Sequence, residues 1–130
     1  MDGYISDKGI ELVDYCKIDV EGHELEVLLG MSRTIREERV KIIQFEYSGT
    51  YIFSGAFLAD IFSFFETLPY SLYKLTPRGL WPVPRWSATH ERFRYSNWIA
   101  VHRDKAALAR QLVRPDLRKL LASNDLRLRA

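Results

Sequence analysis

Most of what the sequence says about the fold starts from Lys17-Ile18-Asp19-Val20-Glu21-Gly22. The apolar run at residues 12–20 predicts a strand that is buried on both faces, as strands of parallel sheets are. Two carboxylates and a glycine follow its last apolar positions, and a helical pattern begins at once over residues 24–29. Because ligands bind at the carboxyl ends of strands in open α/β sheets, this stretch predicts a site.

Strand and helix patterns continue to both sides of a polar loop. We expect helices at 32–38 and 56–68, strands at 40–47, 70–75 and 95–102, and an irregular loop at 80–93. The last two strands have no helix between them, which favours antiparallel pairing. Two further helices are expected, one at 105–113 capped by Asp104 and one capped by Asp116 that runs to Leu121. The order predicts an α/β fold with parallel strands first and an antiparallel addition at the end.

Composition limits the class of protein. The 130 residues are 47% hydrophobic, which fits one packed domain or a part of one. The net charge of +2 gives no argument for a polyanionic partner. The charge is uneven, since residues 103–130 hold eight lysines and arginines against three aspartates. We therefore divide the chain into a partial domain at 1–103 and a basic helical tail at 104–130.

The cysteine count and the hydropathy bear on the compartment. Cys16 is the one cysteine, which excludes an internal disulfide, and its apolar surroundings predict a buried hydrophobic side chain. No stretch approaches the roughly 20 apolar residues of a membrane span, and Met1-Asp2-Gly3 does not open a signal peptide. A cytoplasmic location is the expectation.

The residues alone leave two interpretations of the acidic stretch. Asp19 and Glu21 alternate along an extended strand end, which places both on one side of a cleft. Glu46 ends the next strand and reaches the same cleft. Alternatively, the acids cap the helix that follows, since carboxylates favour helix N-termini. A metal site at His23 would need a second histidine four residues on, where Val27 stands, so we expect a surface histidine.

Aromatic residues and arginines mix in the last third of the chain. The set is Trp81, Arg85, Trp86, Arg92, Arg94 and Trp98. Nucleic-acid and sugar-binding surfaces have this composition, and so does an ordinary loop folded over a sheet edge. We favour the loop, with a share in a substrate lid, and expect no nucleic-acid partner.

Several of these segments together resemble the FkbM family of S-adenosylmethionine-dependent methyltransferases. The matching stretches are 17–24, 28–30, 43–47, 70–75 and 95–102, so that the resemblance covers roughly residues 3–103. It implies the C-terminal half of a class I (Rossmann-like) methyltransferase fold, in which a mostly parallel seven-stranded sheet ends in an antiparallel strand. The segments 12–20, 40–47, 70–75 and 95–102 would be its fourth to seventh strands.

The resemblance also implies a function and a site. The reaction is transfer of a methyl group from S-adenosylmethionine to a hydroxyl of a small molecule or sugar. Asp19 is the residue expected to face the cofactor or the substrate, with Glu21 close to the same cleft and Glu46 reaching it from the neighbouring strand. The expected catalytic residues are thus Asp19, Glu21 and Glu46, and Asp19 is also the expected cofactor contact.

The glycines depart from the family pattern. Methyltransferases of this class hold the cofactor on a glycine-rich loop after the first strand, but none of the seven glycines here are two residues apart. We expect that the chain starts just before the fourth strand, lacks the cofactor half and is inactive alone. The alternative is a non-catalytic half-fold that acts as an interaction or structural protein, with the exposed edge of strand 12–20 pairing in a homodimer or with another chain.

Overall fold

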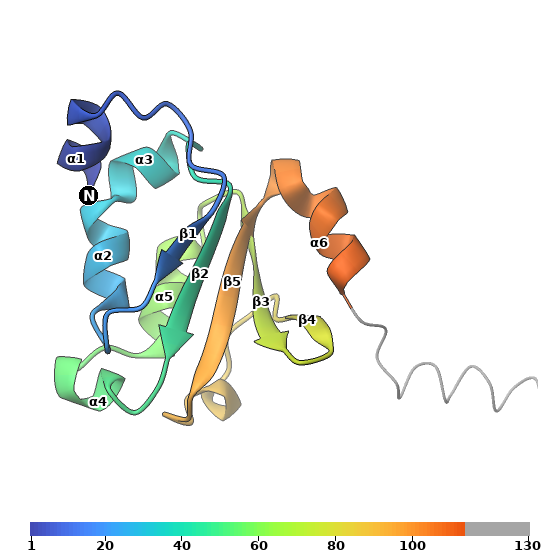
Figure 1. Cartoon of the computed structure of the whole chain (residues 1–130). Coiled ribbons are helices and arrows are strands. Elements are labelled where there is room, and N and C mark those ends of the chain that lie inside the picture. The colour runs from blue at the N-terminus through green and yellow to red at the C-terminus, as the bar shows by residue number, and fades with distance from the viewer. Residues whose placement is uncertain (114–130) are drawn as a thin grey trace, which may run out of the picture.

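A computed structural model describes residues 1–113 as a mixed α/β fold built on a five-stranded sheet (Figure 1). The sheet order is β1-β2-β5-β3-β4. The strands are β1 (Cys16–Ile18), β2 (Ile42–Tyr47), β3 (Tyr70–Thr76), β4 (Gly79–Pro82) and β5 (Ser96–His102). β1 and β2 are parallel, and β5 is antiparallel to both β2 and β3. The expected antiparallel pairing of the last two predicted strands is confirmed.

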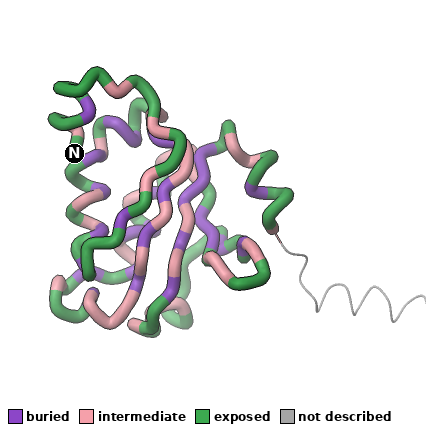
Figure 2. Tube along the Cα trace, viewed as in Figure 1, coloured by how far each residue is buried: buried purple, intermediate pink, exposed green. Residues whose placement is uncertain are grey.

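The first strand is shorter and more exposed than predicted. Only residues 16–18 form β1, and Val13 adds an isolated bridge to Val40. Lys17 is exposed and Cys16 is half-buried, so the expectation of a strand buried on both faces is wrong. The reason is its place: β1 lies at the edge of the sheet, and the tube view shows exposed residues at both of its ends (Figure 2).

One strand was missed altogether. β4 pairs antiparallel with β3 inside the segment predicted as an irregular loop. Gly79, with φ +119°, makes the tight connection, and Leu80 is buried. Pro82 and Pro84 hid this strand, because prolines in so short a run argue against a strand that is not at an edge.

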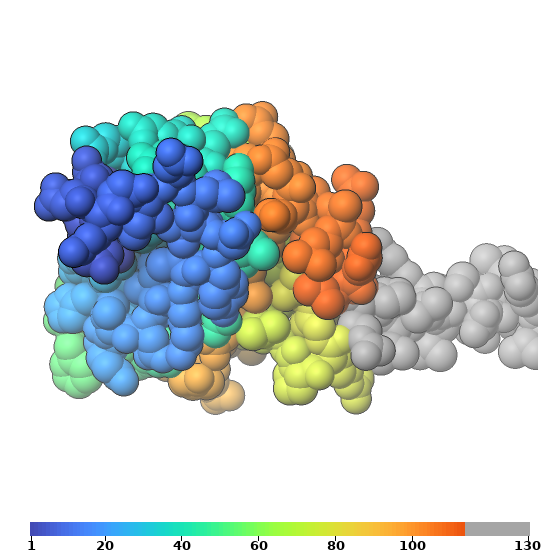
Figure 3. Space-filling model, turned by 45° about the horizontal axis from the view of Figure 1, so that its top comes forward, coloured from blue at the N-terminus to red at the C-terminus, as the bar shows by residue number. Residues whose placement is uncertain are grey.

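Helices cover both faces of the sheet unequally. They are α1 (Asp2–Asp7), α2 (Glu24–Gly30), α3 (Ser32–Arg36), α4 (Tyr51–Ser54), α5 (Leu58–Phe65) and α6 (Ala106–Leu112), with the short 3₁₀ helices η1 (Ala88–His90) and η2 (Arg103–Lys105). The main core joins α2, α3 and α5 to one face through Ile18, Phe45 and Trp98. A smaller cluster joins Ala109 of α6 to the other face, where α6 lies beside β4 (Figure 3).

The predicted capping of the C-terminal helix is wrong. α6 begins after Lys105, and no side chain caps it. The Asp104 carboxylate instead accepts a hydrogen bond from Lys41 Nζ at 2.8 Å, because η2 intervenes between β5 and α6. The helix expected from Asp116 to Leu121 lies outside the described residues. Within residues 1–113, no helix is long and apolar enough to cross a membrane.

The strand directions define two ends of the sheet. β1, β2 and β3 all run the same way, so their carboxyl ends meet the amino end of β5 at one end, the lower one in Figure 1. We call this the carboxyl edge, and the opposite end the amino edge. The acidic stretch that follows β1 lies at the carboxyl edge.

Candidate functional site

A tight turn carries the acidic stretch away from β1. The strand stops at Ile18, and two successive residues take positive φ angles, Glu21 at 55° and Gly22 at 101°. A Cβ on Gly22 would lie 2.8 Å from the carbonyl carbon and oxygen of Thr50. The glycine is therefore required twice, by its own backbone and by the close passage of the loop after β2.

A buried carboxylate closes this turn from inside. Glu24 is fully buried, and its Oε1 accepts a hydrogen bond from the Val20 backbone N–H at 3.1 Å. No group in the described part of the chain donates a hydrogen bond to its Oε2. Burial, with the negative charge of Glu24, raises the pKa of the neighbouring Tyr51 hydroxyl. Sequence reasoning missed Glu24, because an acidic residue in the first turn of a helix is ordinarily assigned to solvent.

The carboxylates of the stretch do not cap the next helix. The N-cap of α2 is His23, and no side chain makes a capping hydrogen bond there. Asp19 instead accepts a hydrogen bond from Lys17 Nζ at 2.7 Å, and both side chains are exposed. The alternation argument is also wrong, since β1 ends before Asp19 and the backbone turns at Glu21. The capping interpretation thus leaves Asp19 and Glu21 unexplained.

Glu46 brings the three predicted carboxylates into one cluster. It lies one residue before the end of β2, opposite Asn97 of β5. Partial burial, followed by the negative charges of Asp19 and Glu21, raises the pKa of the Glu46 carboxyl. The turn after β1 therefore lies beside the end of β2, as the carboxyl ends of neighbouring parallel strands do. A carboxylate with a raised pKa is a stronger base, which suits proton abstraction from a hydroxyl.

A ladder of polar side chains crosses the sheet next to Glu46. The Tyr15 hydroxyl donates to Gln44 Oε1, Gln44 Nε2 donates to Asn97 Oδ1 at 2.9 Å, and Asn97 Nδ2 donates to the Tyr95 hydroxyl at 3.1 Å. Gln44 and Glu46 are two residues apart on β2 and so share a face of the sheet. The open face beside the carboxylates is therefore ordered and polar. No local sequence pattern predicts this ladder, because it depends on strand register.

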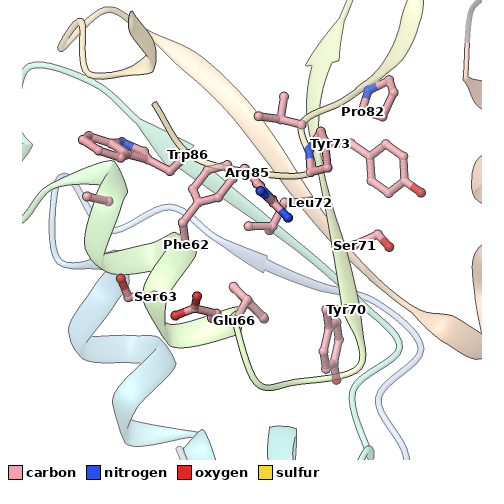
Figure 4. A pocket seen from close by; sticks show the side chains of 14 residues that line it. Phe62, Ser63, Glu66, Tyr70, Ser71, Leu72, Tyr73, Pro82, Arg85 and Trp86 are labelled. Carbon is pink, nitrogen blue, oxygen red and sulfur yellow. The ribbon is translucent and has the colours of Figure 1, made fainter. Parts of the chain in front are cut away.

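The predicted mixture of aromatics and arginines does not form one surface. Trp98 is buried in the main core, and Trp81 is exposed on β4. Arg85 and Trp86 line a cavity of about 960 Å³ between α5 and β3 (Figure 4). This cavity reaches Tyr70, at the amino end of β3, and so extends away from the carboxylate cluster.

Glu91 fixes the loop that follows β4. Its carboxylate accepts hydrogen bonds from the Leu58 and Ala59 backbone N–H groups at 3.0 and 3.2 Å, which begin α5. It also accepts from the Tyr47 hydroxyl at 2.6 Å and from Trp86 Nε1 at 3.3 Å. One side chain thus ties the loop to a helix N-terminus and to the end of β2. The predicted loop is ordered by a residue that sequence reasoning did not single out.

The described residues contain neither a group of side chains arranged to bind a metal ion nor an activated thiol. No group of three or more His, Cys, Asp or Glu side chains within residues 1–113 is placed to hold a metal ion. His23 is a surface residue, with an exposed side chain 3.5 Å from Glu26. Burial raises the pKa of the Cys16 thiol, which disfavours the reactive thiolate.

Comparison with known families bears directly on this site. A family model for the methyltransferase FkbM domain matches residues 1–72, which include β1, the acidic turn and all of β2. The match ends within β3, whereas the predicted resemblance runs on to β5. Curated proteins and solved structures give no match. Because the matched segment is more than half of the 130 residues, the chain belongs to the FkbM methyltransferase domain family.

Proposed function

We propose that this chain forms the acceptor side of an S-adenosylmethionine-dependent methyltransferase site that methylates a hydroxyl of a small molecule or sugar. The observation that carries the proposal is the carboxylate cluster of Asp19, Glu21 and Glu46 at the carboxyl edge, inside the segment that matches the family. A class I fold is supported by the strand directions. With β1, β2, β3 and β5 as its fourth to seventh strands, the seventh is antiparallel to its neighbours, as that fold requires.

The positions of the three carboxylates suit them to different roles. S-adenosylmethionine, when bound, supplies an electrophilic methyl group on a positively charged sulfonium. Asp19, at the end of β1, would face the cofactor, and its negative charge suits a cation. Glu46, whose raised pKa makes it the better base, would accept the proton of the acceptor hydroxyl. Glu21 keeps the local charge negative and the pKa of Glu46 raised.

Tight cofactor binding needs more than these carboxylates. The sequence holds no Gly-x-Gly pattern that would cradle the cofactor after a strand. We therefore propose that this chain alone binds S-adenosylmethionine weakly, through the charge of its cluster, and does not turn over.

Ligand-observed NMR with the 130-residue chain tests both parts. We expect selective broadening of the sulfonium methyl resonance, with a dissociation constant far above the micromolar range. Asp19→Asn and Glu46→Gln should each weaken binding by about threefold, the size of an exposed charge interaction. The controls are Asp7→Asn and Glu11→Gln, which remove the same charges from exposed positions outside the cluster.

Two outcomes would count against the proposal. Stoichiometric micromolar binding of S-adenosylmethionine would show that the chain holds a complete cofactor site. Equal weakening by the control variants would show that net charge, and not the cluster, attracts the cofactor. S-adenosylhomocysteine lacks the sulfonium charge and its methyl group. Its remaining resonances should broaden less with the wild-type chain than those of S-adenosylmethionine, and Asp19→Asn should change this broadening little.

The free edge of β1 favours a second candidate function, assembly. Within the part of the chain that the structure describes, β1 pairs with β2 on one side only, and Leu12, Tyr15 and Val20 are exposed around it. Unpaired backbone groups on an edge strand accept another strand, so a homodimer or a partner chain would complete the sheet. Sedimentation velocity over a wide concentration range should reveal a dimer. A stable monomer at every concentration would contradict self-pairing through β1.

A further inference from the structure

A second set of charges lies at the carboxyl edge, on the face that α5 covers. A cavity of about 350 Å³ opens there, lined by side chains from β2, β3, β5 and the loop between β4 and β5. Lys74, Arg92 and Arg94 line it, and none of the three makes an ion pair within residues 1–113. Three cations that converge without a directly paired carboxylate favour an anion at this place.

The Glu91 carboxylate is the nearest one in sequence to these cations, and it is held by other groups. Glu91 lies next to Arg92, but its two oxygens accept hydrogen bonds from Leu58, Ala59, Tyr47 and Trp86. These bonds hold the carboxylate at the start of α5. The positive groups of the cavity therefore remain available to a ligand.

Packing holds two of the cations in place. The Lys74 ammonium lies 5.7 Å from the centroid of the buried Trp98 ring, a cation–π distance. Arg92 Nε donates to the Thr89 carbonyl at 2.8 Å, and the two terminal guanidinium nitrogens make no hydrogen bond to residues 1–113. Each contact restrains an otherwise exposed side chain, which reduces the freedom that it loses when an anion binds.

His90 adds a neutral donor to the same cavity. Its Nδ1 accepts a hydrogen bond from the Ser87 backbone N–H at 3.0 Å, so the ring proton is on Nε2. The ring stacks on Phe62, with centroids 6.3 Å apart and planes 9° from parallel. Burial, then the charges of Lys74 and Arg92, lowers the pKa of His90. A neutral imidazole with a free N–H can donate to an anion at physiological pH.

We propose that this cavity binds the phosphate or carboxylate group of the methyl acceptor, so that the acceptor is an anionic small molecule such as a sugar phosphate or a sugar acid. Tyr47 lines the cavity and directly follows Glu46, so the cavity and the carboxylate cluster lie at the same end of β2, on opposite faces of the sheet. An acceptor that reaches both would lie across the carboxyl edge, with its anionic group in the cavity. The volume is at the lower end for ligand pockets and suits one small charged group. The identification of this ligand as the acceptor rests on the proposed methyltransferase function; the anion site itself does not.

Amide and imidazole NMR shifts of the 130-residue chain test the proposal. The probes are glucose 6-phosphate, glucuronate, glucose and a short single-stranded oligonucleotide. We expect glucose 6-phosphate, glucuronate or both to shift resonances of residues 87–98, including the His90 ring, while glucose does not. Lys74→Met and Arg92→Gln should each weaken binding about tenfold, as loss of a charge-assisted hydrogen bond does. Lys8→Met and Arg78→Gln, exposed cations elsewhere, should leave binding unchanged.

The outcomes separate this proposal from its rivals. Equal shifts with glucose, or binding that Lys74→Met and Arg92→Gln leave intact in folded protein, would overturn it. Preference for the oligonucleotide, lost in the same two variants, would assign the cations to nucleic acid and overturn it as well. Comparison of the phosphate and carboxylate probes identifies the group. No step uses S-adenosylmethionine, so failure of methyl transfer and failure of anion binding are told apart.

Discussion

The charged side chains at the two ends of the sheet differ in how many of them form ion pairs. At the amino edge, Glu38 Oε2 lies 3.1 Å from His102 Nε2 and its Oε1 lies 2.7 Å from Arg103 Nη2. Lys41 and Asp104 pair there at 2.8 Å. At the carboxyl edge, Asp19 forms an exposed pair with Lys17, whereas Glu21 and Glu46 make no ion pair within the described residues. Charges that pair hold strands together, whereas charges left unpaired are available to a ligand.

The same contrast extends across the carboxyl edge itself. Negative groups gather at the turn after β1, and positive groups gather around Trp98 on the face that α5 covers. The groups that fix this edge are different residues, chiefly Gly22, Glu24 and Glu91. The residues that hold this edge together are therefore not the residues of the proposed sites, and substitutions should separate effects on stability from effects on binding.

The largest expected effect is at Gly22. Gly22→Ala forces a Cβ to within 2.8 Å of the Thr50 carbonyl at a φ of +101°, so it should lower the free energy of unfolding by about 3 kcal/mol. Urea denaturation measures the change. Gly3→Ala is the matched control, since no atom lies within 4 Å of its Cβ and it lies in α1. A neutral Gly22→Ala would show that the loop after β2 does not pass this close.

Glu91 comes second. Glu91→Ala leaves the Leu58 and Ala59 N–H groups and the Tyr47 hydroxyl without their acceptor, which should cost about 2 kcal/mol. Glu66→Ala, an exposed glutamate after the end of α5, should change stability by less than about 0.5 kcal/mol. Thermal unfolding of both variants, followed by circular dichroism, checks the difference. Equal melting temperatures would contradict the anchoring role of Glu91.

Matched lysines compare the two edges directly. Lys41→Met removes donors to Asp104 and to the Glu38 carbonyl and should cost about 1 kcal/mol. Lys17→Met, in the exposed pair with Asp19, should leave the free energy of unfolding nearly unchanged, because solvent screens that pair. The hydrogen bond from Lys41 lowers the pKa of Asp104, so its contribution is present above the unfolded pKa and is lost as pH falls through the lowered value. Urea denaturation across the acid range should show this loss in the wild type and not in Lys41→Met.

The smallest change in stability is expected for Glu46→Gln. Unlike the other substitutions, it should be neutral or slightly stabilising. Because burial and the charges of Asp19 and Glu21 raise its folded pKa, ionised Glu46 destabilises the fold above that pKa. The penalty is relieved as pH falls through the folded pKa and is absent below the unfolded one. Glu46→Gln should thus be neutral to slightly stabilising at neutral pH, by less than about 0.5 kcal/mol. Carboxyl ¹³C NMR should find the pKa of Glu46 closer to its ordinary value in Asp19→Asn.

Sequence reasoning reached the parts that depend on local pattern. The periodicity at 40–47 and at 56–68 predicted β2 and α5, and the missing helix before β5 predicted its antiparallel pairing. It failed where the structure depends on pairing between segments that are far apart in the sequence. β4 forms by pairing with β3, and β1 is a short edge strand that pairs only with β2 among residues 1–113.

The site shows the same limit. The end of β1 and the end of β2 were visible in the sequence, so Asp19, Glu21 and Glu46 could be placed at one edge. The tasks of Glu24 and Glu91 could not, because each depends on a backbone N–H group that only the folded chain brings near. The positions of Lys74, Arg92 and Arg94 around one cavity likewise depend on the path of the loop after β4.

A map of amide chemical-shift changes on adding S-adenosylmethionine tests most directly whether the carboxylates of the carboxyl edge, Asp19, Glu21 and Glu46, form a ligand site. We expect changes at residues 19–22 and 46–48 and none around the paired charges of Glu38 and His102. Changes at the amino edge, or no changes at residues 19–22 at saturating cofactor, would contradict it.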